Sequence, residues 1–278
     1  SMLAKAFVSI LPPMTIKEIL ETTHLHSLQR QDYEIVRYNR PFRSPHHSAS
    51  ETAVTGGGTN PRPGEISLSH NGVLFFDEFP EFKRSTIESL RQPLEDGKIT
   101  ISRAKDSIDF PAKFILLATA NPCPCGYFGT DKECTCTPHH IYSYRKKISG
   151  PIIDRIDLYA NVENVEHAKL LESNHGNDTS SKVRKRVEKA RAIQTQRFKI
   201  GRTNSTMHSR EVKKYAQLTD TARNLLDKGA SRLELSPRAY MRTLKVARTI
   251  ADLDESELIL DKHIAEALQY RPIYNSNL

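Results

Sequence analysis

The sequence predicts a three-layer α/β core over about residues 1 to 205, followed by a helical domain over residues 206–278. Two continuous apolar runs, at 73–76 and 114–118, are each followed by polar residues. Runs of this length are typical of parallel strands that are buried on both faces. From residue 209 onward, apolar residues recur only at helical spacing, which indicates a separate helical domain.

The residues between the two apolar runs predict a helix over 85–95 and then a β-hairpin. Apolar and polar residues alternate at 98–101 and again at 107–110, which is the pattern of paired strands. The expected tip of this hairpin carries Arg103 and Lys105. Basic side chains at such a tip can follow a phosphate backbone, so they are the candidate nucleic-acid contacts; an ordinary exposed turn is the alternative.

The helical domain contains three expected helix starts. Thr219 precedes one apolar-periodic run, Ser236 and Pro237 precede the second, and Asp261 precedes the third. Short polar side chains cap exposed backbone N–H groups at a helix start, and proline fits the first helical position. The segment 40–64, by contrast, is dense in Pro, Gly, Ser and His, and we expect an ordered loop or insertion there.

The chain carries 41 Lys and Arg residues against 33 Asp and Glu residues, so its formal net charge is +8. This balance suits a polyanionic partner, although solubility explains it equally well. The excess is concentrated at 182–202, where the spacing predicts an amphipathic helix with a basic outer face. That face is either solvated or a contact for nucleic acid or a protein partner.

Membrane and export signals are missing from the sequence. It has no run of about 18 apolar residues, and its first residues lack the apolar stretch of a secretory signal. We therefore expect a cytoplasmic protein with no membrane partner.

All four cysteines, Cys123, Cys125, Cys134 and Cys136, fall within fourteen residues of one another, in an expected insertion over residues 121–140. Such close spacing cannot staple a secreted fold, and in a reducing compartment it favours a metal site over disulfides. Four thiolates can close a tetrahedral Zn²⁺ site, which leaves no open position for water and is therefore structural. Free thiols are the alternative.

Asp77 and Glu78 directly follow the first apolar run, and Asn121 follows the second. Ligands of open α/β folds bind at the carboxyl edge of the sheet, where these side chains are expected. Phosphoryl transfer needs one carboxylate to hold Mg²⁺ and a second to orient the attacking water, which suits Asp77 and Glu78 respectively. Asn121 could bond a phosphate or the water without adding charge; an ordinary turn residue is the alternative.

Four sequence runs resemble an AAA+ ATPase: GVLFFDE at 72–78, ATAN at 118–121, SGPIIDRID at 149–157 and LSPR at 235–238. Further runs extend the resemblance over nearly the whole chain: RPFRSPHH at 40–47, GGG at 56–58, PRPGEI at 61–66, NPCPCG at 121–126 and ARTIADL at 247–253. On these runs the chain is identified as a member of the magnesium-chelatase-like ComM/YifB family.

This resemblance implies a hexameric ring that binds ATP and Mg²⁺ at its subunit interfaces. Asp77 and Glu78 match the Walker B pair, and Asn121 matches sensor 1. Arg155 matches an arginine finger supplied in trans, and Arg238 matches sensor 2. A guanidinium is permanently charged and forks onto phosphate oxygens, which suits both arginines.

Both arginines also have ordinary structural alternatives. For Arg155, the alternative is an ion pair with Asp154 or Asp157. For Arg238, which shares its expected helix with Arg242, the alternative is likewise a purely structural role.

The sequence departs from the family pattern in one large respect. No G-x-x-x-x-G-K-[ST] motif occurs in it, so it supplies no phosphate-binding loop, and residues 2–6 resemble the helix that follows that loop. We expect the AAA+ core to lack its first strand and this loop, and the chain alone to bind ATP poorly and to hydrolyse essentially none.

The function implied by the resemblance is an ATP-driven ring motor acting on DNA, a branch-migration type of helicase used in natural transformation or recombination. A magnesium chelatase ATPase subunit, which drives Mg²⁺ insertion into a porphyrin, is the enzymatic alternative. A non-catalytic ring scaffold is the third interpretation, and the joint presence of the carboxylates, Asn121 and both arginines argues against it.

Overall fold

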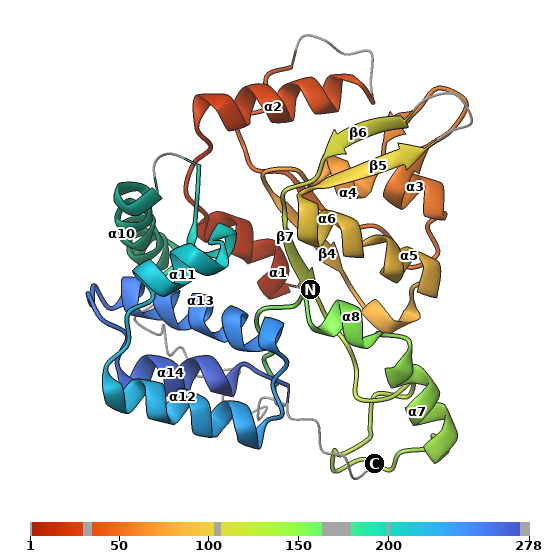
Figure 1. The fold of residues 1–278 in the computed structure, drawn as a ribbon. Coiled ribbons are helices and arrows are strands. Elements are labelled where there is room, and N and C mark those ends of the chain that lie inside the picture. The colour runs from red at the N-terminus through yellow and green to blue at the C-terminus, as the bar shows by residue number, and fades with distance from the viewer. Residues whose placement is uncertain (1, 30–34, 103–106, 163–178, 199–200, 273–278) are drawn as a thin grey trace. The chain divides into compact units, whose positions relative to one another are not determined.

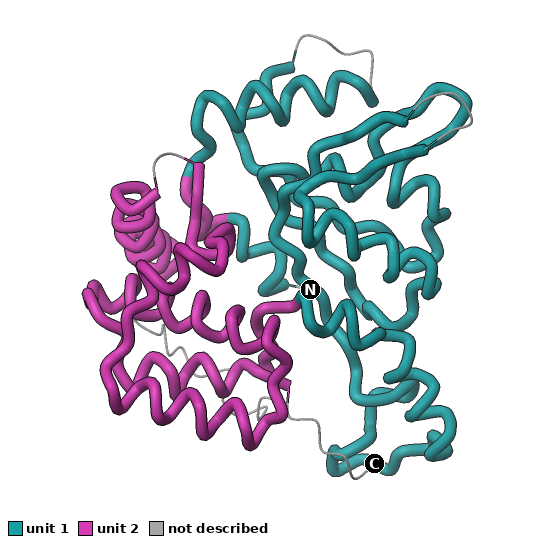
Figure 2. The backbone as a smooth tube through the Cα atoms, in the orientation of Figure 1, with its two compact units in different colours: residues 1–8, 13–155 teal, residues 9–12, 156–278 magenta. Residues whose placement is uncertain are grey.

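The computed structural model describes residues 2–29, 35–102, 107–162, 179–198 and 201–272. The chain divides into two compact units. Unit 1 comprises residues 1–8 and 13–155, and unit 2 comprises residues 9–12 and 156–278 (Figure 2). The two compact units divide after residue 155. The domain boundary expected near residue 205 stays a prediction.

Unit 1 is built around a short parallel sheet (Figure 1). Its strand order is β1 (Phe42–Arg43), β4 (Val73–Phe76) and β7 (Ile115–Ala118). β4 lies in the centre, and all four of its side chains are buried. The predicted α/β core with a parallel sheet is therefore confirmed.

The second apolar run is not the fully buried central strand that its sequence indicated. Within the described residues, β7 is bonded to β4 alone, so it forms an edge of the sheet. Its side chains are partly exposed, Ile115 to 37%. The apolar composition was correctly assigned to a strand, but composition alone does not say whether a further strand covers it.

The segment 40–64 is ordered and supplies an outer strand of the sheet. A Cβ atom at Gly72 would lie 2.0 Å from the Pro41 carbonyl oxygen, so only glycine allows β1 to approach β4 this closely. Beyond β1 the segment forms three short elements: α3 (Glu51–Thr55), β2 (Gly56–Gly57) and β3 (Arg62–Pro63). The remaining helices of unit 1 that precede β4 are α1 (Met2–Phe7), α2 (Ile16–Ser27) and α4 (Glu65–Leu68).

The helix expected over 85–95 is divided into α5 (Arg84–Ser89) and α6 (Arg91–Asp96). Pro93 has no N–H to donate to the carbonyl of Ser89, so the helical hydrogen bonding is interrupted there. The hairpin that follows is confirmed, with β5 (Lys98–Ser102) antiparallel to β6 (Ser107–Pro111).

Beyond β7, unit 1 ends with α7 (Pro138–Lys146) and α8 (Gly150–Ile153). Among the described residues, none of the helices is both long and apolar enough to cross a membrane.

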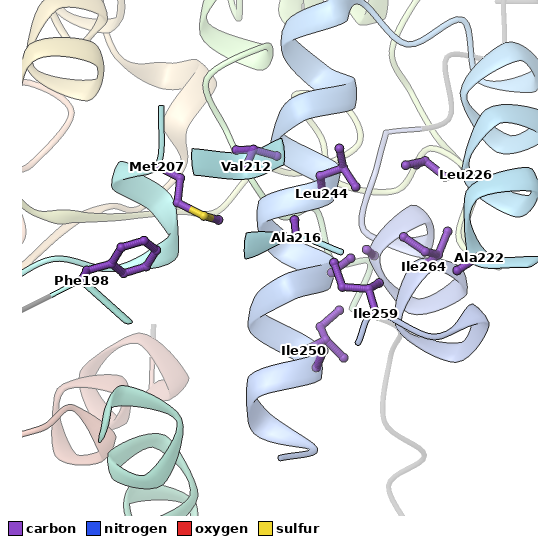
Figure 3. Packing of buried hydrophobic residues seen from close by; sticks show 13 residues of the cluster. Phe198, Met207, Val212, Ala216, Ala222, Leu226, Leu244, Ile250, Ile259 and Ile264 are labelled. Atoms are coloured by element: carbon purple, nitrogen blue, oxygen red, sulfur yellow. The ribbon is translucent and has the colours of Figure 1, made fainter. Parts of the chain in front are cut away.

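In its described residues, unit 2 contains helices and one β-bridge, between Leu218 and Ile259. Its helices are α10 (Ser180–Phe198), α11 (Ser209–Tyr215), α12 (Asp220–Arg232), α13 (Pro237–Leu253) and α14 (Asp261–Gln269). Side chains from these helices and their connections form one core, which includes Leu226, Leu244 and Ile264 (Figure 3). The expected helical domain is confirmed as a fold, and α10 packs on α13 as part of it.

Two of the three expected helix starts have the predicted caps. The hydroxyls of Thr219 and Ser236 each accept a backbone N–H in the first turn of the following helix. Asp261 was wrong as a cap, because it is already the first helical residue of α14. Its carboxylate instead accepts a hydrogen bond from the Thr221 hydroxyl at 2.6 Å, which ties α14 to the start of α12.

Candidate functional site

The polar side chains that follow β4 and β7 meet at one edge of the sheet, because the two strands are parallel and in register. Phe76 lies opposite Ala118 at the last pair of the ladder. Asp77 and Glu78 therefore leave β4 at the level where Thr119 leaves β7, and Asn121 follows two residues later. Asp77, Glu78 and Asn121 are all exposed to solvent. This edge is where ligands of open α/β folds bind.

Sequence reasoning missed Thr119, which joins the two strand ends. Its hydroxyl donates to Asp77 Oδ1 at 2.7 Å and accepts the backbone N–H of Glu78 at 2.9 Å. Its carbonyl accepts the N–H of Phe79 at 2.8 Å. The available signal was a hydroxyl residue at the first position after β7, directly opposite the first carboxylate.

Glu78 adopts a left-handed backbone conformation, with φ 54° and ψ 53°. This region costs a residue with a Cβ atom roughly 1–2 kcal/mol, so it occurs where the surroundings enforce it. The next residue, Phe79, is buried, and its ring lies 5.5 Å from that of Phe76. The turn is therefore supported by the apolar packing of Phe79 and by hydrogen bonds to Thr119.

Arg155 lies in unit 1, in the turn after α8, and its side chain is 9% exposed. It pairs with Glu95 of α6 and donates to the Pro151 carbonyl at 2.8 Å. The partner is thus neither Asp154 nor Asp157, the two carboxylates that the sequence offered as alternatives. A tertiary contact across sixty residues could not be read from local sequence, and the structure as described holds Arg155 away from solvent.

Arg238 lies in the first turn of α13, directly after the Ser236 cap and Pro237. The side chain is exposed. One turn later, Arg242 pairs with Asp157 at 2.6 Å. Arg238 belongs to unit 2, whereas the two carboxylates that follow β4 belong to unit 1.

The four cysteines come together as the sequence predicted. Their sulfur atoms all lie within 4.8 Å of one another. The Cys123 Sγ is 3.4 Å from that of Cys125 and 3.7 Å from that of Cys134. Sulfurs bound to one tetrahedral Zn²⁺ at about 2.3 Å would be about 3.8 Å apart. The cluster could therefore hold a metal ion with little rearrangement.

The protonation of the cluster also fits a cation. The backbone N–H of Tyr127, together with neighbouring thiols, lowers the pKa of Cys125 to about 6. The N–H of Cys136 lowers the pKa of Cys134, but burial and the adjacent Cys125 and Cys123 sulfurs outweigh it and raise that pKa to about 12. A bound cation would relieve the repulsion among thiolates held this close together.

Helix α7 ties the cysteine loop to the residue proposed as sensor 1. Arg145 donates to the Pro122 carbonyl at 3.2 Å, and its guanidinium lies 5.0 Å from the centre of the Phe128 ring. Tyr144 is buried to 4% exposure and interacts with the backbone of Asn121. Burial, with a smaller contribution from Glu81, raises the pKa of Tyr144. The backbone on both sides of Pro122 is thus fixed by one helix.

The structure describes one of the two basic candidate surfaces and not the other. Arg103 and Lys105, at the tip of the β5–β6 hairpin, lie outside the described residues. The helix expected within 182–202 is present as α10, and its basic outer face is largely exposed. Part of its charge is used within unit 2, because Arg197 pairs with the buried Asp252 at 2.6 Å.

Comparison with known proteins gives two family matches and several relatives. Residues 1–170 match the family described as "Magnesium chelatase, subunit ChlI", and residues 177–271 match "Magnesium chelatase, subunit ChlI C-terminal". The chain is 45% identical to the competence protein ComM of Haemophilus influenzae, over 98% of this chain and 53% of that protein. It is 43% identical to YifB of Salmonella typhimurium, over 98% of this chain and 54% of that protein.

A more distant similarity is to the DNA replication licensing factor Mcm6 of Drosophila melanogaster, at 24% identity over 74% of this chain and 25% of that protein. The chain thus spans about half the length of the bacterial relatives it matches.

Proposed function

Because the chain belongs to the magnesium-chelatase-like family that includes ComM and YifB, we propose that it is part of an ATP-driven ring motor that acts on DNA. The single observation that carries the ATPase assignment is the placement of Asp77, Glu78 and Asn121 at one edge of the parallel sheet. In this proposal the ring is a homo-hexamer located in the cytoplasm.

Each side chain at the edge has a role suited to its chemistry. Asp77 would hold Mg²⁺, which when bound neutralises charge on the phosphates. Glu78 orients the attacking water and accepts its proton, and Asn121 donates a hydrogen bond to a phosphate or to the same water. Arg238 would contact the phosphates from the helical unit.

Arg155 would serve the nucleotide site of the neighbouring subunit, because its guanidinium can stabilise charge that develops on the transferred phosphoryl group. In the single chain this guanidinium is paired with Glu95. The assignment therefore requires that assembly of the ring breaks the pair.

The phosphate-binding loop is not encoded in these 278 residues. We expect the chain by itself to hydrolyse essentially no ATP, whereas the whole protein would do so. Within the described residues, β7 pairs on one side only, which leaves an edge to which a strand leading into such a loop could add.

A DNA substrate is favoured by the competence protein among the relatives and by the net charge of +8. The exposed basic face of α10 is a possible contact, and so are Arg103 and Lys105. The magnesium chelatase alternative has no evident use for the cysteine cluster, which is the specific observation against it.

The test is the ATP turnover of the whole protein with no DNA, with single-stranded DNA and with branched DNA. The motor proposal expects stimulation by DNA. If neither DNA form binds to the protein or changes its ATP turnover, DNA is refuted as the substrate and the magnesium chelatase alternative is favoured. A protein without ATP turnover under any condition would favour the ring scaffold.

We also propose that the cysteine cluster binds one structural Zn²⁺ through Cys123, Cys125, Cys134 and Cys136. Four thiolates leave no open coordination position, so the ion would fix the loop after Asn121 rather than take part in hydrolysis. Metal analysis of protein purified without chelator should give one zinc per chain. Substoichiometric zinc in a folded protein, unchanged when Cys134→Ser removes one ligand, would refute this assignment.

A further inference from the structure

Thr119 bonds both the Asp77 carboxylate and the Glu78 backbone, and none of the roles proposed above uses it. We propose that Thr119 is a positioning residue, whose hydroxyl fixes the Asp77 carboxylate for Mg²⁺ and the Glu78 backbone for its contact with water. This inference rests on the proposed ATPase function, because the two carboxylates have these roles only in an ATPase.

The contact with Asp77 leaves one carboxylate oxygen available. Thr119 donates to Oδ1 at 2.7 Å, and among the described residues no protein donor is recorded on Oδ2. A donated hydrogen bond restricts the rotation of the carboxylate and leaves the second oxygen available to a cation. Hydrogen bonds of this kind to metal-ligating carboxylates orient them and raise the affinity for the ion.

The contacts with the backbone act on the turn that carries Glu78. The left-handed conformation of Glu78 is unfavourable for a residue with a side chain, and it needs support from its surroundings. Thr119 accepts two successive amide protons of this turn, that of Glu78 on its hydroxyl and that of Phe79 on its carbonyl. Its own N–H donates to the Phe76 carbonyl at 3.0 Å. The turn is therefore bonded to one residue of the neighbouring strand.

The hydroxyl is what side-chain chemistry adds, because any residue at position 119 would supply the two backbone contacts. One oxygen donates to a carboxylate and accepts an amide proton at the same time, and only Ser and Thr place such a group one bond from Cβ. Valine has nearly the same shape and can do neither. Thr119→Val therefore removes both contacts while it keeps the branched side chain that suits a strand end.

The experiment uses the whole protein and compares Thr119→Val, Thr119→Ser and a control, Thr243→Val. Thr243 is a buried threonine of α13 whose hydroxyl donates to the Ala239 carbonyl at 2.9 Å, so its replacement removes an equivalent group far along the chain from the carboxylates. The first readout is the affinity for a fluorescent ATP analogue at varied Mg²⁺ concentration and in EDTA. The second is the Mg²⁺ dependence of ATP turnover, with kcat and KM measured separately.

We expect Thr119→Val to raise the Mg²⁺ concentration needed for nucleotide binding by about 10- to 100-fold, as is typical when a group that supports a metal ligand is removed. Binding in EDTA should be unchanged, and kcat at saturating Mg²⁺ should also fall because Glu78 is displaced. Thr119→Ser should restore most of both, and Thr243→Val should alter neither. Thr119 is exposed, so circular dichroism should show an intact fold; Thr119→Ala repeats the loss with a smaller side chain if valine does not fit.

A Thr119→Val protein with wild-type Mg²⁺ dependence and kcat would overturn this inference alone. Equal losses in Thr119→Val and Thr119→Ser would also overturn it, because the hydroxyl would then not be the cause. A wild-type protein without Mg²⁺-dependent nucleotide binding would overturn the proposed function, and this inference with it.

Discussion

Replacement of Asp252 by alanine would leave two arginines of the helical unit without their shared carboxylate. Arg197 donates to both oxygens of Asp252, at 2.8 and 2.6 Å, and Arg248 donates to Oδ1 at 3.1 Å. Asn204 completes the set with a bond of 2.7 Å to Oδ2. The side chain of Arg248 is 2% exposed and that of Arg197 is 13% exposed, so the charge of Arg248 cannot be rehydrated while the unit stays folded.

We expect Asp252→Ala to lower the free energy of unfolding of unit 2 by about 3–5 kcal/mol, the usual effect of removing one partner from a buried ion pair. The value should lie toward the lower end, because Arg248 keeps its bond to the Glu257 carbonyl at 2.6 Å. Since each 1.4 kcal/mol is a factor of ten, the opening equilibrium should rise by at least about 100-fold.

The chain contains no tryptophan, so hydrogen exchange read by mass spectrometry is the suitable assay, with peptides from α10 and α13 as reporters. Glu255→Ala is the matched control, because this carboxylate is 61% exposed and pairs only at the surface with Lys189; its removal should cost less than about 1 kcal/mol. Equal exchange in Asp252→Ala and Glu255→Ala would refute the reasoning.

Two further predictions follow from other contacts. Burial raises the pKa of Asp252, but the hydrogen bonds from Arg197 and Asn204 outweigh it and hold that pKa below its usual value. The stabilisation is therefore present above about pH 4 and is lost as the pH falls through the lower folded pKa. When the free energy of unfolding is measured against pH, Asp252→Asn should flatten this loss at acid pH. In the whole protein, Arg155→Ala should lower ATP turnover by about 1000-fold while nucleotide binding is retained. Glu95→Ala breaks the same ion pair but keeps the guanidinium, so this variant should stay active. Equal losses of turnover in the two variants would show that the ion pair is structural.

The elements that sequence predicted well are those whose signal is local. Four consecutive apolar residues predicted β4, and the caps Thr219 and Ser236 could be predicted because each directly precedes the helix that it starts. The cysteine cluster was equally local, because its four cysteines lie within one loop. In these cases the physical cause and the sequence pattern occupy the same short window.

The features that sequence did not predict depend on contacts between distant segments. The partner of Arg155 is a glutamate sixty residues earlier, on the last turn of α6. Thr119 makes its contacts with Asp77 and Glu78 only because β7 is in register with β4. The edge position of β7 likewise depends on which strands pair with it, which its apolar composition does not encode.

The most direct test of the central claim is the ATP turnover of the whole protein with and without Glu78→Gln, measured alongside nucleotide binding. The substitution keeps the size of the side chain but removes its negative charge and its ability to accept a proton. We predict that nucleotide binding is retained while turnover falls by about 100-fold or more, the usual contribution of a general base. Wild-type turnover in Glu78→Gln would contradict the assignment of this sheet edge as the site of ATP hydrolysis.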